Sequence, residues 1–147
     1  MPLVVAPLNT QDAPAVKQLL IAGLSERWGA YEPRYNPDIE AFPGSYSGSF
    51  ILVAKSAGVV VGTGTLRPIS ARQAEVVRMS TATNSRRNGV ASTILNLLLE
   101  QASANGVQEV VLETTSSWAS AIAFYTKHGF YKTYVQDGDT HFSYHFR

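Results

Sequence analysis

The chain has 147 residues, 45% of them hydrophobic, which is enough to bury one substantial core and too little for two ordinary domains. Its formal net charge of +1 carries no general signature of nucleic-acid or membrane binding, and the absence of cysteine excludes disulfides, thiolate metal ligands and a thiol nucleophile. No hydrophobic run has the length of a membrane span or the form of a secretory leader. We therefore expect a single domain over residues 1–147, located in the cytoplasm, with neither nucleic-acid nor membrane partners.

The first third of the chain predicts a strand, a helix and a long loop. Residues 3–8 are typical of a strand. Thr10 or Asp12 can cap a helix that begins around Pro14, keeps one apolar face and ends near Gly29. Residues 30–49 contain several prolines, glycines and aromatic residues, so we expect a loop-rich segment that shapes a pocket, with one short helix near Asp38.

The rest of the chain predicts a mixture of strands and helices. We expect strands over residues 50–55, 59–66, 74–81 and 109–114, helices over 90–104 and 118–128, and a terminal hairpin of residues 131–135 and 142–146. Gly62 and Gly64, inside the second of these strands, indicate a bulge or a close packing contact. The fold class is therefore α+β, or mixed α/β.

The turn between the strand at 74–81 and the helix at 90–104 is the most distinctive segment. It reads Ser-Arg-Arg-Asn-Gly-Val-Ala-Ser over residues 85–92. The first turn of a helix has backbone N–H groups without intrahelical partners and an electropositive dipole end, and Gly89 lets an anion approach them. Arg86 and Arg87 add long-range attraction. The turn predicts a phosphate site; the alternative is an ordinary turn with two solvated arginines.

Two other phosphate-binding motifs are excluded. A P-loop is absent because no Gly-Lys-Ser or Gly-Lys-Thr follows a suitably placed glycine. The start at Gly62-Thr63-Gly64 fails as a Rossmann fingerprint, since Arg67 stands in place of the third glycine and Pro68 in place of the helix start.

Two motifs resemble those of the GNAT superfamily of acyl-CoA-dependent N-acyltransferases, and the expected elements between them follow the order of that family. The motifs are Arg86-x-x-Gly89-x-Ala91, like the family's pyrophosphate loop, and Ala121-x-x-x-Tyr125-x-x-x-Gly129-Phe130, like its late helix. The match covers residues 73–131 well, whereas the N-terminal third agrees in element order only. Many members have Asn where this chain has Ala119, so Ser117 or Ser120 would have to supply that contact.

The resemblance implies a three-layer fold in which a central, twisted, mostly antiparallel sheet of about six or seven strands splays apart at the acyl-CoA site and is flanked by helices. It implies acetyl-CoA as cosubstrate and no metal. The pantetheine arm would pair with the main chain of Met79 and Thr81, and the pyrophosphate would meet the turn. The implied cofactor-binding residues are Met79, Ser80, Thr81, Arg86, Arg87, Asn88, Gly89, Val90, Ala91, Ser92, Ala121 and Tyr125.

The implied reaction is direct attack of a primary amine on acetyl-CoA in a ternary complex. The position of Tyr125 is that of the family's general acid, which would protonate the departing thiolate; the alternative is an aromatic core residue. Glu75 lies eleven residues before Arg86, where one branch of the family has its glutamate base. Glu75 could instead pair with the substrate or face solvent, in which case water would take the proton.

The acceptor is expected at the loop after the first helix, and the sequence leaves its identity open. The substrate-binding candidates are Trp28, Tyr31, Arg34 and Tyr35. Aromatic rings attract cationic amines, but the arginine would equally suit a carboxylate-bearing substrate. The acceptor is thus an amine of a small molecule or peptide, and the protein a monomer or homodimer. A non-catalytic acyl-CoA-binding regulatory module is the alternative function.

Overall fold

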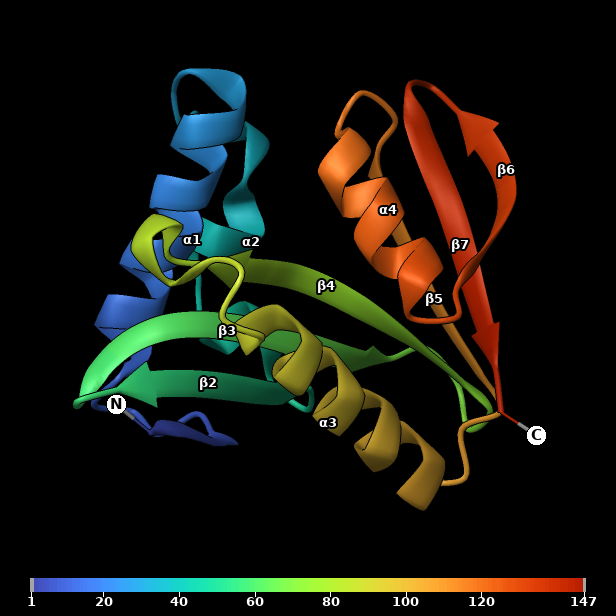
Figure 1. Ribbon diagram of the computed structural model, residues 1–147, viewed down its shortest axis with the longest axis horizontal. Coiled ribbons are helices and arrows are strands. Elements are labelled where there is room, and N and C mark those ends of the chain that lie inside the picture. Colours follow the sequence, from blue (N-terminus) through green and yellow to red (C-terminus); the bar gives the residue numbers. More distant parts are fainter. Residues whose placement is uncertain (1, 147) are drawn as a thin grey trace.

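The computed structural model describes residues 2–146 and contains seven strands with helices between them (Figure 1). The strands are β1 (Leu3–Pro7), β2 (Phe50–Ser56), β3 (Val59–Pro68), β4 (Gln73–Thr81), β5 (Glu109–Thr115), β6 (Tyr131–Gln136) and β7 (Asp139–His145). The α-helices are α1 (Ala13–Trp28), α2 (Pro37–Glu40), α3 (Val90–Ala104) and α4 (Ala119–Lys127). Short 3₁₀ turns occupy Pro33–Tyr35, Gly44–Tyr46 and Thr83–Ser85. The mixed class and the elements expected from the sequence are confirmed.

The strands form one sheet in the order β1-β2-β3-β4-β5-β7-β6, antiparallel except where β4 meets β5. These two strands pair only over Gln73–Glu75 and Glu109–Val111 and then diverge, as Figure 1 shows. Beyond the point where they diverge, β4 remains paired with β3 and β5 remains paired with β7. The predicted splayed, mostly antiparallel sheet is therefore present, and the split lies between β4 and β5.

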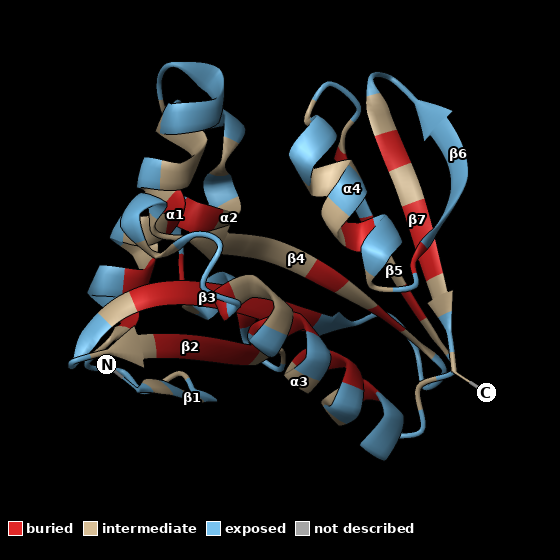
Figure 2. Cartoon of the chain, viewed as in Figure 1, coloured by how far each residue is buried: buried red, intermediate tan, exposed pale blue. Residues whose placement is uncertain are grey.

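Helices cover both faces of the sheet and make a three-layer molecule. Alternation along β2 sends Leu52 and Ala54 into a core shared with α3 and α4, and Ile51 and Val53 into a second core shared with α1 and α2. Figure 2 shows the buried positions concentrated on β2, β3 and the sheet-facing side of α3. The two cores therefore lie on opposite faces of the sheet, and the core with α3 and α4 includes residues from both sides of the split.

A β-bulge interrupts β4 beside the split. Thr63 pairs with Ser80 and Thr65 pairs with Val77, so Gly64 alone lies opposite two residues of β4, the first of which, Arg78, has a φ of 53°. A side chain at Gly64 would collide with α3, because its Cβ would lie 2.8 Å from a methyl carbon of Ile94. This glycine therefore serves both roles that the sequence suggested, a bulge and a close contact.

One local expectation is wrong. Asp12 occupies the N-cap position of α1, but its side chain makes no capping hydrogen bond. Its Oδ2 atom lies 2.7 Å from Lys55 Nζ on β2 instead, and the helix start is organised by Asn9, whose Oδ1 accepts the Asp12 N–H at 3.0 Å. Gly29 ends the helix as expected, with a φ of 82°.

Candidate functional site

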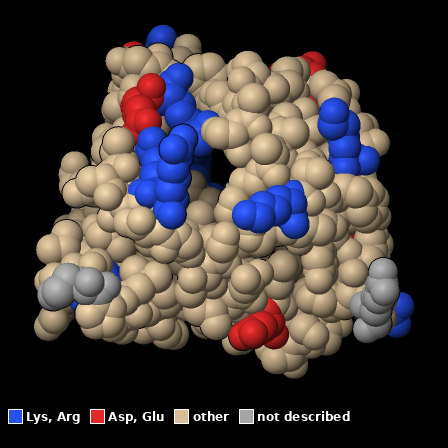
Figure 3. Space-filling view, in the orientation of Figure 1, with Lys and Arg blue, Asp and Glu red and all other residues tan. Residues whose placement is uncertain are grey.

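The split between β4 and β5 holds a cavity of about 760 Å³. Its walls come from α1, α2, β4, β5 and α4, which are distant in sequence and meet only because the sheet opens here. The cavity reaches the surface as the hollow seen in Figure 3, with Lys and Arg side chains on both sides of its opening. A smaller hollow of about 180 Å³ adjoins it at the turn before α3, and the two share Thr81, Arg86, Ala91 and Phe124.

The turn before α3 presents unused backbone donors. Gly89 has a φ of 78° and is the N-cap residue of α3 with no side-chain cap, and Arg87 is also left-handed with a φ of 67°. Among the described residues, none accepts a hydrogen bond from the N–H groups of residues 87–92. A Cβ at Gly89 would meet nothing within 4 Å, so the space over these amides is open. This geometry fits an anion such as a pyrophosphate.

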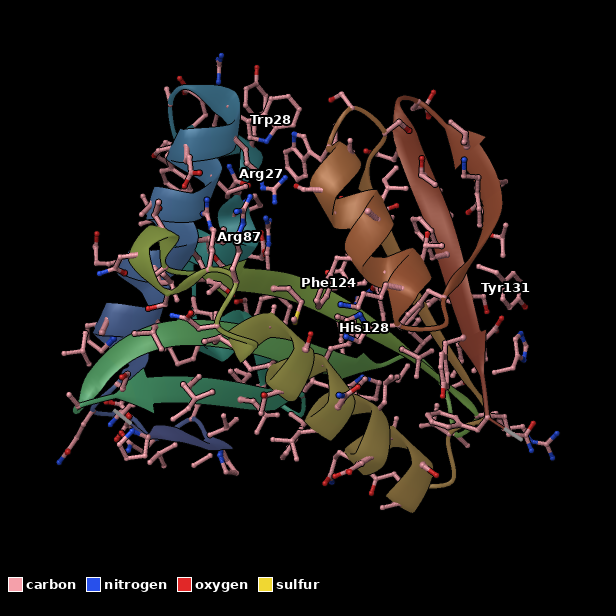
Figure 4. All side chains as sticks on the ribbon, in the orientation of Figure 1. Arg27, Trp28, Arg87, Phe124, His128 and Tyr131 are labelled. Atoms are coloured by element: carbon pink, nitrogen blue, oxygen red, sulfur yellow. The ribbon has the colours of Figure 1, made fainter. Side chains whose placement is uncertain are left out.

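The two arginines of the turn have different roles. Arg86 is hydrogen-bonded to Glu26 on α1, with Nη2 at 2.8 Å from Oε2, and its Nε donates to the Thr81 carbonyl at 3.3 Å. The hydrogen bond from Arg86 lowers the pKa of Glu26 to about 2, so the two charges neutralise each other. Arg87 makes no ion pair within the described chain and lies beside the turn in Figure 4. The long-range attraction therefore comes from Arg87, while Arg86 ties the turn to α1.

The exposed edge of β4 forms one long wall of the cavity. Met79, Ser80 and Thr81 line it beyond the point where pairing with β5 ends. The bulge leaves Met79 without a register partner on β3, so its main chain is outside the ladder. An unpaired strand edge can accept an extended amide chain as one more strand. The wall therefore has the form that a pantetheine arm requires.

Tyr125 of α4 brings a phenol to the opposite wall. The residue is 9% exposed, its ring packs against Phe124, Phe130 and Phe142 at centroid distances of 5.2 to 6.3 Å, and its hydroxyl has no hydrogen-bond partner among the described residues. Burial raises the pKa of Tyr125 to about 12. Because the cavity includes this residue, a neutral, protonated donor faces the split.

The other residues expected at the cofactor site divide between the two hollows. Ala121 lines the large cavity, Val90 and Ser92 line the small one, and Asn88 lines neither. Of the two serines considered as substitutes for the missing asparagine, Ser120 lines the cavity.

Glu75 of β4 also faces the cavity, in an ion pair. Its Oε1 atom accepts hydrogen bonds from both Nε and Nη2 of Arg67, the Nε bond being 3.1 Å long. Oε2 makes no hydrogen bond within the described chain, so one carboxylate oxygen remains available to a ligand or to water. The structure thus brings Glu75 and Tyr125 to one cavity, as their proposed roles require.

The expected acceptor residues are only partly assembled there. Trp28 lines the cavity, whereas Tyr31, Arg34 and Tyr35 do not. Tyr31 donates to Glu40 at 2.6 Å, and burial together with this carboxylate raises the pKa of Tyr31 to about 12. The Arg34 guanidinium lies over the Tyr35 ring, which is 69% exposed. These three side chains organise the loop surface.

A half-buried cluster of Asp38, Arg78 and Tyr46, which the sequence did not identify, lines the cavity in their place. Asp38 accepts two 2.8 Å hydrogen bonds from the Arg78 guanidinium and one from the Tyr46 hydroxyl. Burial alone would raise the pKa of Asp38, but the bonds from Arg78 and Tyr46 lower it below its ordinary value. Arg78 lies in the β4 bulge and reaches Asp38 on α2. The alternation of residues along a strand does not show this contact. Asp38 itself was visible near the predicted short helix, but its partner was not.

Two tryptophans bridge the wide end of the split. Trp28 lies at the end of α1 and Trp118 just before α4, and the centroids of their rings are 5.3 Å apart. The Arg27 guanidinium is 4.5 Å from the centroid of the Trp118 ring. Figure 4 shows Arg27 and Trp28 at the mouth between the two helices. Trp118 is half-buried and lines the cavity, so it covers the split and is not an ordinary core residue.

A twisted mixed sheet that opens around one ligand cavity, with backbone donors at a helix start, defines an α/β ligand-binding or enzyme domain. The profile of the acetyltransferase (GNAT) family matches residues 13–130. The chain belongs to this family. No helix in residues 2–146 is long and apolar enough to cross a bilayer, and the described side chains form no group of three potential metal ligands.

Relatives and solved structures agree with this assignment. N-acetyltransferase 8 of Mus musculus is 34% identical over 94 residues, covering 60% of this chain and 41% of that protein. N-acetyltransferase family 8 member 2 of Rattus norvegicus is 35% identical over 91 residues, covering 58% and 40%. The chain therefore spans less than half the length of these curated relatives.

Two solved structures share the whole fold at low identity. The PaiA N-acetyltransferase of Thermoplasma acidophilum, in complex with coenzyme A, has a TM-score of 0.88 at 18% identity, covering 99% of this chain and 100% of that one. A GNAT-family acetyltransferase of Staphylococcus aureus Mu50 has a TM-score of 0.87 at 16% identity, with the same coverage.

Proposed function

We propose that the protein is an N-acetyltransferase that transfers an acetyl group from acetyl-CoA to a primary amine by direct attack in a ternary complex. The observation that carries this proposal is the Tyr125 hydroxyl, a buried and protonated donor without a hydrogen-bond partner in residues 2–146, in the same cavity as the open edge of β4. The family membership and the coenzyme A bound to the PaiA protein support the donor.

The donor site is built mostly from main chain. The N–H groups of residues 87–92 would hold the pyrophosphate, with Arg87 adding charge, and the edge of β4 from Met79 to Thr81 would pair with the pantetheine amides. Acetyl-CoA supplies the acetyl group and a thiolate as the leaving group. The Met79 N–H, freed from the ladder by the bulge, would donate to the thioester carbonyl oxygen.

Proton movements complete the reaction. An alkylamine with a pKa of about 10.4 is mostly protonated at neutral pH, so a proton must leave before the nitrogen attacks. Glu75 Oε2 would accept it, directly or through water. The nitrogen becomes cationic as it bonds to the carbonyl carbon, and it would give up a second proton to solvent as the amide forms. As the carbon–sulfur bond breaks, Tyr125 would donate its proton to the sulfur and regain one from solvent.

Thiol release from acetyl-CoA in the presence of a panel of amines tests the proposal. We expect amine-dependent release of coenzyme A with one acetylated product per thiol. Tight binding of acetyl-CoA without release for any amine would favour the non-catalytic acyl-CoA-binding module. If neither binding nor protection against thermal unfolding is found, the donor assignment is wrong.

Replacement of Glu75 separates the carboxylate from water as the base. If Glu75 accepts the proton, Glu75→Gln lowers kcat by about 100-fold, and the deficit shrinks as the pH approaches the pKa of the amine. An unchanged pH–rate profile would assign deprotonation to water. Because Arg67 loses its partner in this variant, Arg67→Gln is the matched control for the ion pair itself.

A further inference from the structure

Three of the four arginines that line the cavity are already neutralised by the protein. Their guanidinium groups come from the sheet and the turn, and each is hydrogen-bonded to a carboxylate. The pairs are Arg67 with Glu75, Arg78 with Asp38, and Arg86 with Glu26. An acceptor carboxylate that bound any of these three arginines would have to displace the protein's own carboxylate and leave that charge unpaired.

Two further arginines lie near the opening. Arg87 lies at the turn before α3 and lines the small hollow, so its charge is positioned for the phosphates of the donor. Arg27 lies on the Trp118 ring near the end of α1, at the mouth of the split in Figure 4.

The opposite wall carries unbalanced negative charge. Val110 and Leu112 of β5 are buried in the core with α3 and α4, so alternation places Glu113 on the other face of the sheet, away from these helices. Asp139 of β7 lies on that same face, because its neighbour Thr140 is buried and it pairs in register with Thr115. Neither β5 nor β7 contains a lysine or an arginine.

Both carboxylates line the cavity and lack a strong basic partner. Glu113 Oε2 lies 3.3 Å from Nε2 of His141, and the Asp139 side chain makes no ion pair or hydrogen bond within the described chain. The cavity also contains the unpartnered Tyr125 hydroxyl, which marks where the reacting thioester would lie. A bound amine would reach toward Tyr125 with one end and toward Glu113 and Asp139 with the other.

We infer that the acceptor is an amine that carries a second positive charge, and that Glu113 and Asp139 select it over amines that carry a carboxylate. This inference rests on the proposed acetyltransferase function and names its acceptor class. The sequence alone left cationic and carboxylate-bearing acceptors equally open. The pairing of Arg67, Arg78 and Arg86, together with two cavity carboxylates that have no lysine or arginine partner among the described residues, favours the cationic class.

Three acceptors of equal length provide the test: 1,5-diaminopentane, pentylamine and 5-aminopentanoate, which differ only in the group at the far end. Initial rates of thiol release from acetyl-CoA give kcat/KM for each. We expect the diamine to be the best acceptor and the amino acid the worst. Each carboxylate that contacts the second positive charge should raise kcat/KM for the diamine about three- to fivefold over that for pentylamine. Added salt should narrow this range, because exposed charges are screened.

Variants assign the preference to residues. Glu113→Gln and Asp139→Asn should each bring the diamine closer to pentylamine, and Glu113→Lys should make 5-aminopentanoate better than the diamine. Glu100→Gln, which removes an exposed carboxylate of α3 outside the cavity, is the matched control and should leave the ratios unchanged. Thermal unfolding of each variant verifies that the fold is retained.

Failure of the inference and failure of the function are distinguishable. Acetylation of 5-aminopentanoate as fast as pentylamine, or ratios that persist in Glu113→Gln and Asp139→Asn, would overturn the charge preference while leaving the acetyltransferase in place. Absence of thiol release for every amine would overturn the function. Calorimetric binding of the three compounds to the coenzyme A-loaded protein would still rank them, and weaker binding of the diamine than of 5-aminopentanoate would refute the inference.

Discussion

Removal of one oxygen atom from Tyr125 is the most direct probe of the proposed chemistry. Tyr125→Phe is expected to lower kcat about 100-fold and to leave the KM for acetyl-CoA within about threefold, since a positioned general acid contributes at least that much to the rate. The hydroxyl makes no hydrogen bond to the described protein, so phenylalanine keeps every aromatic contact and strands no buried partner. We therefore expect the free energy of unfolding to change by less than about 0.5 kcal/mol.

The assay separates chemistry from folding. Thiol release is measured at saturating amine for the wild type, Tyr125→Phe and Tyr144→Phe, and each protein is melted thermally. Tyr144 is a suitable control because its ring packs 5.4 Å from Phe130 in the same aromatic core and does not line the cavity. Tyr125→Ala, in contrast, would lose about 3–5 kcal/mol through the cavity it leaves.

Two results would refute the reasoning about Tyr125. Unaltered kcat in Tyr125→Phe would remove the general-acid role. An equal loss in Tyr144→Phe would show that the rate follows the packing of the aromatic core. Because burial raises the pKa of Tyr125 to about 12, the wild-type rate should show no loss from ionisation of this phenol across the neutral range.

Three further predictions concern the turn, the bulge and the ion pair to α1. Gly89→Asp should weaken acetyl-CoA binding about tenfold or more by placing a negative charge over the helix start, whereas Gly106→Asp, at the similar φ of 79° beyond the other end of α3, should not. Gly64→Ala should destabilise the fold by about 1–3 kcal/mol through overpacking against α3, and Gly44→Ala, which faces open space, should be neutral in thermal unfolding. The pKa of Glu26 in the folded protein is about 2, below its ordinary value of 4.5, so the ionised Glu26 stabilises the fold above pH 4.5 and this stabilisation is lost as the pH falls toward 2. In Glu26→Gln, the free energy of unfolding should therefore depend less on pH in this acid range. The same pH dependence in the variant and the wild type would contradict the ion pair.

Much of the fold could be predicted because its signals are local. The 3.6-residue apolar spacing of α3, the glycine that ends α1 and the continuous apolar run of β2 are all visible in neighbouring residues, and each element lies within a few positions of its expected bounds. The turn before α3 was equally visible, since Gly89 and the helix start are adjacent. The role of Arg86 was not, because its partner Glu26 lies 60 residues away.

The acceptor side could not be predicted for the same reason. Arg78 lies in the β4 bulge and bonds to Asp38 on α2, 40 residues earlier in the chain. Gly62 and Gly64 indicated a bulge, but no local pattern indicated which helix Arg78 would contact. Composition placed Tyr31 at the site, since it lies in an aromatic loop beside α1. Its hydroxyl instead donates a hydrogen bond to Glu40 within that loop. The sequence does not indicate this pairing, because both side chains could equally have been exposed to solvent.

The pattern of pairing inside the cavity explains how one small domain can treat its two ligands differently. The arginines that line the cavity from the sheet are held by carboxylates, so the groups left for the acetyl donor are backbone N–H groups and a neutral phenol, which suit a donor of fixed structure. The groups left for the acceptor are Glu113 and Asp139, which project from β5 and β7 and depend on side chains alone. Recognition by backbone N–H groups is retained when side chains are substituted. The side chains of Glu113 and Asp139, in contrast, can be replaced by others without disturbing the sheet. Changes of acceptor within this fold should therefore concentrate on β5 and β7, while the turn before α3 keeps its conformation.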